Sequence, residues 1–133
     1  MRYVLRHPDD TRPSLLVHTS TVADDAAVER LKRDMHGVGC ANGISFTPDE
    51  CVILRDSFSS MDAASIHVEA RLPTEKVLAS IGRRVGELFD AQVERWLRRM
   101  TESWQSAIPA DDAVASEFFQ DIVPAASGSL LST

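Results

Sequence analysis

The stretch PSLLVHTSTVADDAAVERLKRDMHGVGCANGISFTPDECVILRDSF, residues 13–58, decides the fold. Its first apolar run, residues 14–19, is continuous rather than alternating, which is typical of a strand buried on both faces of a sheet. Thr21 then begins a capping-box pattern, and apolar residues recur at helical spacing until Gly37. We therefore expect an α/β fold, with a mixed sheet of about five strands and one helix crossing it.

The second half of this stretch predicts a hairpin. Residues 38–41 suggest a short strand, and Asn42-Gly43 a turn with positive φ. Residues 44–47 and 51–55 are then expected to pair across a type I turn at residues 47–50. In that register Phe46 lies opposite Cys51 and Ile44 opposite Ile53, whereas Val52 and Leu54 point to the other face.

The carboxy-terminal half predicts one more strand and a long helix. Residues 66–72 alternate between apolar and polar, as expected for a half-buried strand near a sheet edge. From Thr74, a plausible N-cap, an apolar stripe at helical spacing runs to Ala107 and includes Val85 and Leu88. A continuous helix would be roughly 50 Å long, against a domain diameter of about 36 Å. Either Gly82 or Gly86 breaks it, or its end packs against another subunit.

Composition bounds the class of protein. With 133 residues and 44% hydrophobic content, the chain suits a single domain, which we place at residues 1–123, followed by a mobile tail at residues 124–133. The net charge of −6 argues against general binding to nucleic acid. Arginine far outnumbers lysine, which indicates a bacterial genome rich in G and C. Without a signal-peptide or membrane-spanning stretch, we expect a cytoplasmic protein that needs no cofactor and no membrane.

The order strand, helix, strand, Asn-Gly and hairpin resembles the core of the restriction-endonuclease-like, or PD-(D/E)xK, superfamily. The likeness is to the amino-terminal region of type I restriction subunits and covers residues 13–58. In that family a Pro-Asp pair precedes the central strand and an acid-x-Lys triplet closes it. Here Pro8-Asp9 matches the pair, but His18-Thr19-Ser20 occupies the place of the triplet. The resemblance thus implies a degenerate nuclease scaffold that lacks a metal-ligating carboxylate and the water-activating lysine.

Several residues carry candidate chemistry. If a displaced nuclease site exists, Asp9, Asp10, His18 and Glu69 are its candidates. His18 suits a metal ligand or a general base, although a lone histidine at the end of a buried strand is more often a hydrogen-bonded core or rim residue. The donor types of a zinc site occur in His36, Cys40, Cys51 and His67, without a Cys-x-x-Cys pair. We favour buried, reduced cysteines and no metal.

One basic cluster has two interpretations. It consists of Arg83, Arg84, Arg95, Arg98 and Arg99, interleaved with two tryptophans. As a nucleic-acid surface it would contact phosphates. Interspersed acids, Glu87, Glu94 and Glu102, favour a solvated helix face with ion pairs instead.

These observations lead to three functional hypotheses. The first is a non-catalytic binding or assembly module on a degenerate nuclease-like scaffold, which forms a homodimer and has an unidentified protein partner. Its interface candidates are Phe89, Val93, Trp96, Met100 and Trp104. The alternatives are a metal-dependent nuclease with a displaced site, and a small acidic chaperone or adaptor.

Overall fold

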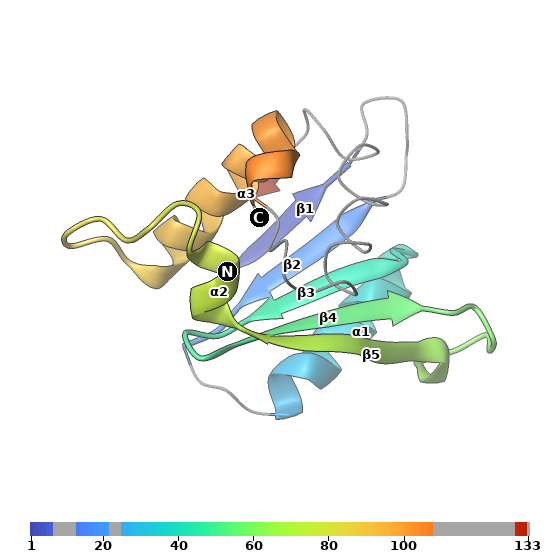
Figure 1. Cartoon of the computed structure of the whole chain (residues 1–133). Helices are drawn as coiled ribbons and strands as arrows, with labels where there is room; N and C mark the ends of the chain where they lie inside the picture. Colours follow the sequence, from blue (N-terminus) through green and yellow to red (C-terminus); the bar gives the residue numbers. More distant parts are fainter. Residues whose placement is uncertain (7–12, 22–24, 108–129, 133) are drawn as a thin grey trace.

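The computed structural model describes residues 1–6, 13–21, 25–107 and 130–132, and within this part the chain forms a mixed sheet covered by helices (Figure 1). The sheet order is β5-β4-β3-β2-β1-β6. The strands are β1 Arg2–Leu5, β2 Leu15–Thr19, β3 Asn42–Phe46, β4 Glu50–Asp56, β5 Ile66–Pro73 and β6 Leu130–Ser132. The helices are α1 Asp25–Val38, α2 Thr74–Leu78 and α3 Phe89–Ala107, with a short 3-10 turn η1 at Ala63–Ser65. The expected α/β class, with β1 to β5 as a five-strand mixed sheet, is confirmed.

The strands pair as a crossover unit followed by a meander. β2 and β3 are parallel and joined by α1, whereas β1 with β2, β3 with β4 and β4 with β5 are antiparallel. The predicted hairpin register is confirmed, with Ile44 opposite Ile53 and Phe46 opposite Cys51. Thr47 closes the turn by a backbone hydrogen bond of 2.9 Å to the carbonyl of Glu50.

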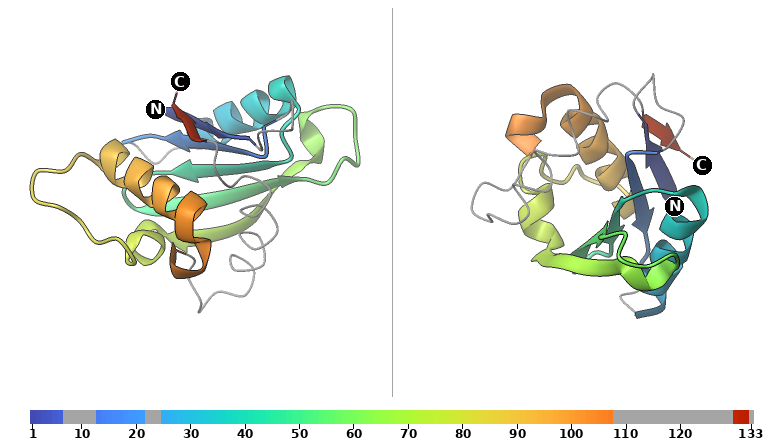
Figure 2. Two further views of the ribbon diagram at one scale, coloured as in Figure 1. Left: turned by 90° about the horizontal axis from the view of Figure 1, so that it is seen from above. Right: turned by 90° about the vertical axis from the view of Figure 1, so that its right-hand side faces the viewer.

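Two cores lie on opposite faces of the sheet, as the two views of Figure 2 show for the helices that cover them. On one face α1 packs through Val28, Leu31 and Met35. On the other face α2 and α3 cover the larger core. Alternate residues of each strand supply the two cores, so Leu16 faces α1 and Val17 faces α3.

β5 lies at the sheet edge, as predicted, but a bulge divides it. The register shifts between Ile53 and Leu54, which leaves Glu69 as an extra residue on β5. As a result Val68 packs on the α1 side and Leu72 on the α3 side. The alternating apolar residues of this strand therefore serve both cores rather than one.

The expected strand at residues 38–41 and the turn at Asn42-Gly43 are wrong. The last residue of α1 is Val38, and Gly39 follows it with a φ of +71°, which allows a Schellman cap. In that cap Cys40 N donates to the carbonyl of Met35 at 2.9 Å. Asn42 and Gly43 instead begin β3.

Gly43 is small because α1 approaches the sheet closely there. A Cβ at Gly43 would lie 2.5 Å from the Sδ of Met35 and 3.2 Å from a methyl group of Leu31. The Asn-Gly pair thus reflects close packing of helix on strand, not a positive φ.

The long apolar tract from Thr74 is broken. α2 ends at Leu78 and α3 begins at Phe89, and both Gly82 and Gly86 in the loop between them have positive φ, +61° and +76°. The chain therefore turns back instead of extending beyond the domain. Figure 1 shows this loop projecting from the body of the molecule.

Part of the expected tail is in the sheet. Leu130 to Ser132 pair antiparallel with β1, with Leu131 opposite Val4. The remainder of the tail, residues 124–129 and 133, lies outside the described residues.

Candidate functional site

The interface candidates on α3 face the chain's own sheet. Val93, Trp96 and Met100 are completely buried in the core beneath α3. Trp96 meets Phe46 edge to face, with ring centroids 5.4 Å apart. Phe89 is partly buried against the same core, and the side chain of Trp104 lies outside the described part. The expectation that these residues form a subunit interface is thereby corrected for the three buried ones, which a second chain cannot reach.

The two nuclease candidates that the structure describes, His18 and Glu69, lie far apart. His18 lies on β2 and Glu69 on β5, three strand spacings apart, or roughly 14 Å. Glu69 instead pairs with His67 at 2.9 Å. Asp9 and Asp10 lie outside the described residues.

The four zinc candidates are also dispersed. Cys40 belongs to the core beneath α1 and Cys51 to the core on the opposite face of the sheet. Burial raises the pKa of the Cys40 thiol to about 11 and raises that of Cys51 still further. Among the residues that the structure describes, no group of three His, Cys, Asp or Glu side chains is placed to hold a metal ion.

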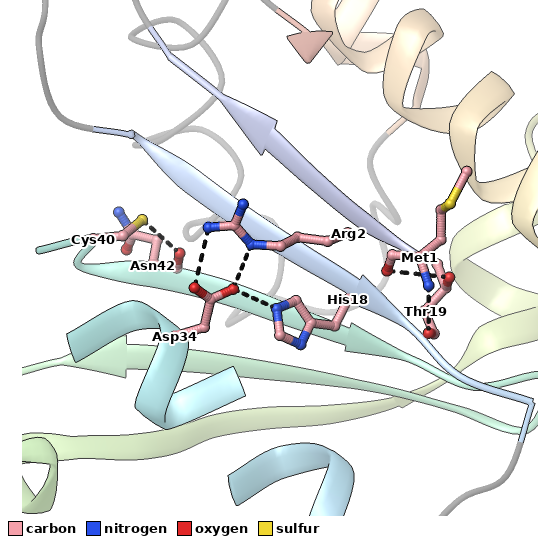
Figure 3. A network of polar contacts seen from close by, with 7 residues as sticks. All are labelled: Met1, Arg2, His18, Thr19, Asp34, Cys40 and Asn42. Atoms are coloured by element: carbon pink, nitrogen blue, oxygen red, sulfur yellow. Dashed lines mark hydrogen bonds and ion pairs between the residues drawn. The ribbon is translucent and has the colours of Figure 1, made fainter. Parts of the chain in front are cut away.

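His18 belongs to a charged cluster that joins three elements. Asp34, on α1, accepts two hydrogen bonds from Arg2 on β1, at 2.6 Å from Nε and 3.1 Å from Nη2 (Figure 3). His18 Nε2 lies 2.7 Å from the same carboxylate. The histidine is thus hydrogen-bonded at the rim of the sheet, and the carboxylate fixes the orientation of its ring.

Asp34 remains ionised in this cluster. Partial burial raises its pKa, but the hydrogen bonds from Arg2 and His18 outweigh that effect, so its pKa is lowered overall. Because a carboxylate can only accept, the facing Nε2 of His18 carries a hydrogen. Nδ1 of His18 then accepts a hydrogen bond when the ring is neutral and donates one when it is protonated.

An open depression of about 360 Å³ lies beside this cluster, at the carboxyl ends of the parallel strands β2 and β3. Ligands of open α/β sheets commonly occupy this position. The residues that line it are Met1, Arg2, His18, Thr19, Ser20, Ala27, Arg30 and Ser45. His18 and Ser20 therefore face an opening and not a packed wall.

Ser45 stands out among the lining residues. It is 3% exposed, and it borders the depression from β3. It lies next to His18 in the register of β2 and β3. Its hydroxyl can therefore contact a molecule in the depression.

The basic cluster divides into two kinds of arginine. Arg83 and Arg84 are exposed on the loop between α2 and α3. Arg95 and Arg98 form ion pairs of 2.8 Å with Glu87 and 2.9 Å with Glu94. These are two of the three acids that the sequence suggested; the side chain of Glu102 lies outside the described part.

Arg95 holds the loop at residues 79–88 in place. Its guanidinium donates to the carbonyls of Ile81 and Gly82, each at 2.8 Å, and to both carboxylate oxygens of Glu87. The hydrogen bonds from Arg95 lower the pKa of Glu87. The loop that interrupts the helical tract is therefore anchored to α3.

The anchored loop presents two apolar side chains to solvent. Val85 is fully exposed, and Leu88 is 76% exposed. Beside the loop lies a depression of about 540 Å³. Its walls include Pro48, Thr74, Glu75, Leu78, Gly82 and Phe89.

Comparisons with protein-family models, with curated proteins and with solved structures found no match for this chain. The resemblance to the restriction-endonuclease-like superfamily thus remains a prediction. Within the described residues, no helix combines the length and the hydrophobicity that a membrane span requires.

Proposed function

We propose that the protein is an assembly module that forms a homodimer through the loop at residues 79–88. The observation that supports this proposal is that Arg95 anchors the loop while Val85 and Leu88 on the loop are exposed to solvent. Exposed single apolar residues are common on proteins. Two of them on a projecting, anchored loop beside a depression form a contiguous docking surface instead.

The energetic argument rests on burial and pre-organisation. Burying an aliphatic side chain of this size contributes about 1.5–3 kcal/mol. Association also costs conformational entropy wherever a loop must be ordered on binding. Because Arg95 and Gln92 already bind the carbonyl of Gly82, much of that ordering exists before contact.

The loop fits a second copy of the same chain. A twofold dimer needs a self-complementary patch, in which a protrusion and a recess lie side by side. Here Val85 and Leu88 protrude next to the recess lined by Leu78 and Phe89. Reciprocal exchange would place the loop of each chain in the recess of the other.

One pair of charges is complementary in the same arrangement. Glu75 and Arg83 both line the recess, and Arg84 is exposed on the loop. In a reciprocal dimer Arg84 of one chain would meet Glu75 of the other. Opposite charges at an interface favour one register and disfavour competing ones.

The test is the molar mass in solution, measured by sedimentation and light scattering over a concentration series. We expect the wild type to reach the mass of two chains, and Val85→Asp to have the mass of one chain at the same concentrations. Met61→Ser is the matched control, because Met61 is 98% exposed on the loop between β4 and β5, away from this surface. A one-chain mass for the wild type, or dissociation by Met61→Ser, overturns the proposal.

Charge exchange tests the register independently. Glu75→Arg and Arg84→Glu should each weaken the dimer, and the double variant should restore it. If the double variant is as weak as the sum of the single variants, the two residues do not face each other and reciprocal exchange is refuted.

A further inference from the structure

We infer that the depression at the carboxyl ends of β2 and β3 is a binding site for a phosphate group, carried by a small molecule or free. This site is separate from the loop between α2 and α3. The inference rests on three observations: the charges that line the depression, the hydroxyl groups of Ser20 and Ser45 that border it, and the fixed orientation of His18.

The lining is cationic in a chain whose net charge is −6. Arg2, His18 and Arg30 border the depression, and among the described residues that line it none is acidic. The carboxylate of Asp34 accepts hydrogen bonds from Arg2 and His18 and so neutralises part of the positive charge beside the depression. Arg30 is exposed on α1. It adds a cation at the mouth of the depression.

Hydroxyl groups complete the donor set. Ser20, directly after β2, and Ser45 on β3 both line the depression. Ser45 is only 3% exposed, and the part that is exposed borders the depression. A bound oxyanion could therefore accept a hydrogen bond from its hydroxyl.

The arrangement favours phosphate over carboxylate. Donors come from several parts of the chain: β2 contributes His18, the residue after it is Ser20, β3 contributes Ser45, and α1 contributes Arg30. A tetrahedral anion offers acceptor oxygens in several directions, whereas the two oxygens of a carboxylate lie in one plane and suit a single bidentate donor. Ala27 on α1 is small, which leaves room for the anion.

The ring of His18 has a fixed orientation beside the depression. Nε2 faces Asp34 at 2.7 Å, so Nδ1 is the ring nitrogen that can contact a ligand. The charged groups around the ring are Arg2 from β1 and Asp34 and Arg30 from α1; Ser45 from β3 is neutral.

The test is an NMR titration of the full chain with inorganic phosphate, and with acetate as the comparison anion. We expect saturable shifts at the amides of Ser20 and Ser45 and at the ring nitrogens of His18. Arg30→Gln should lower the affinity at least about tenfold, the effect of losing one charge-assisted hydrogen bond. Arg33→Gln, which removes the same charge from an exposed position of α1, should leave the affinity unchanged.

Three results would overturn the inference. Shifts that grow linearly without saturation mean that no site exists. Equal affinity for acetate and phosphate contradicts the phosphate class. Equal losses in the Arg30 and Arg33 variants mean that only the overall charge matters. Since neither arginine contacts the core, both variants should fold, which the amide spectrum itself reports.

Discussion

Replacing Gly43 with alanine tests how closely α1 packs on the sheet. The added Cβ would lie 2.5 Å from Met35 Sδ and 3.2 and 3.3 Å from two methyl carbons of Leu31. Both side chains are completely buried, so neither can swing into solvent. Overpacking of this kind costs about 1–3 kcal/mol, and the reduced chain entropy of alanine offsets about 0.5–1 kcal/mol of it. The net loss of stability is thus about 1–2 kcal/mol.

Thermal unfolding followed by circular dichroism measures this loss. For 133 residues the unfolding entropy is about 0.28 kcal/mol/K, so Tm should fall by about 4–7 °C. Gly37→Ala is the matched control, because a Cβ there meets nothing within 4 Å in the same helix and should raise Tm. In a Met35→Ala background the cost of Gly43→Ala should shrink, because only the longer contacts of 3.2 and 3.3 Å with Leu31 remain. If Gly43→Ala stabilises the wild type as Gly37→Ala does, the close approach of helix and strand is refuted.

Three further predictions concern the charged and thiol groups. Because the pKa of Asp34 is lowered in the folded state, its stabilising effect is present above about pH 4 and is lost as the pH falls through the folded pKa. Asp34→Asn should therefore reduce the dependence of the urea unfolding midpoint on pH at acid pH. An unchanged dependence would contradict this. Cys40 and Cys51, both buried with raised pKa values, should react with a thiol reagent at about pH 8 only after denaturation; rapid labelling of the native protein would show that the cores open. Arg95→Gln should speed tryptic cleavage after Arg84, whereas Arg99→Gln on the same helix should not; equal rates would mean that Arg95 does not anchor the loop.

The hairpin could be predicted because its signals are local. A proline-containing turn at residues 47–50 fixes the register, and the alternating apolar residues then define both faces. Asn42-Gly43 was misread because glycine serves two physical purposes. It permits positive φ, and it permits close approach of another element. Only the second applies at Gly43, and its cause, the position of Met35 on α1, is a tertiary contact that local sequence does not reveal.

The interrupted helix shows a limit of periodicity. Val85 and Leu88 fit the helical stripe by spacing, but the structure exposes both in a loop. The two glycines that adopt positive φ were recognised as candidate break points. Apolar spacing does not distinguish a residue that packs on the sheet from one that the loop holds in water, because that depends on where the chain turns back.

The candidate sites were only partly visible in the sequence. His18 was singled out, and a hydrogen-bonded rim position was favoured for it, as the structure shows. Its partners Asp34 and Arg2 were missed because they resemble ordinary surface charges on a helix and a strand. Arg95 was assigned to ion pairs with acids, but its bonds to the carbonyls of Ile81 and Gly82 have no sequence signal.

The carboxyl end of β2 connects the two proposed sites, and this offers a way to separate them. Neighbouring residues of a strand point to opposite faces, so His18 faces α1 while the Thr19 hydroxyl donates at 2.5 Å to Asp90 in the first turn of α3. Asp90→Ala removes this bond beside Leu88 and, unlike a change at Thr19, alters none of the residues named as lining the depression. We expect it to weaken self-association and to leave the phosphate-induced shifts at Ser45 unchanged. The opposite result, loss of the phosphate-induced shifts with self-association intact, would contradict this assignment. It would mean that the hydrogen bond at Thr19 supports the depression on the α1 face and not the loop between α2 and α3.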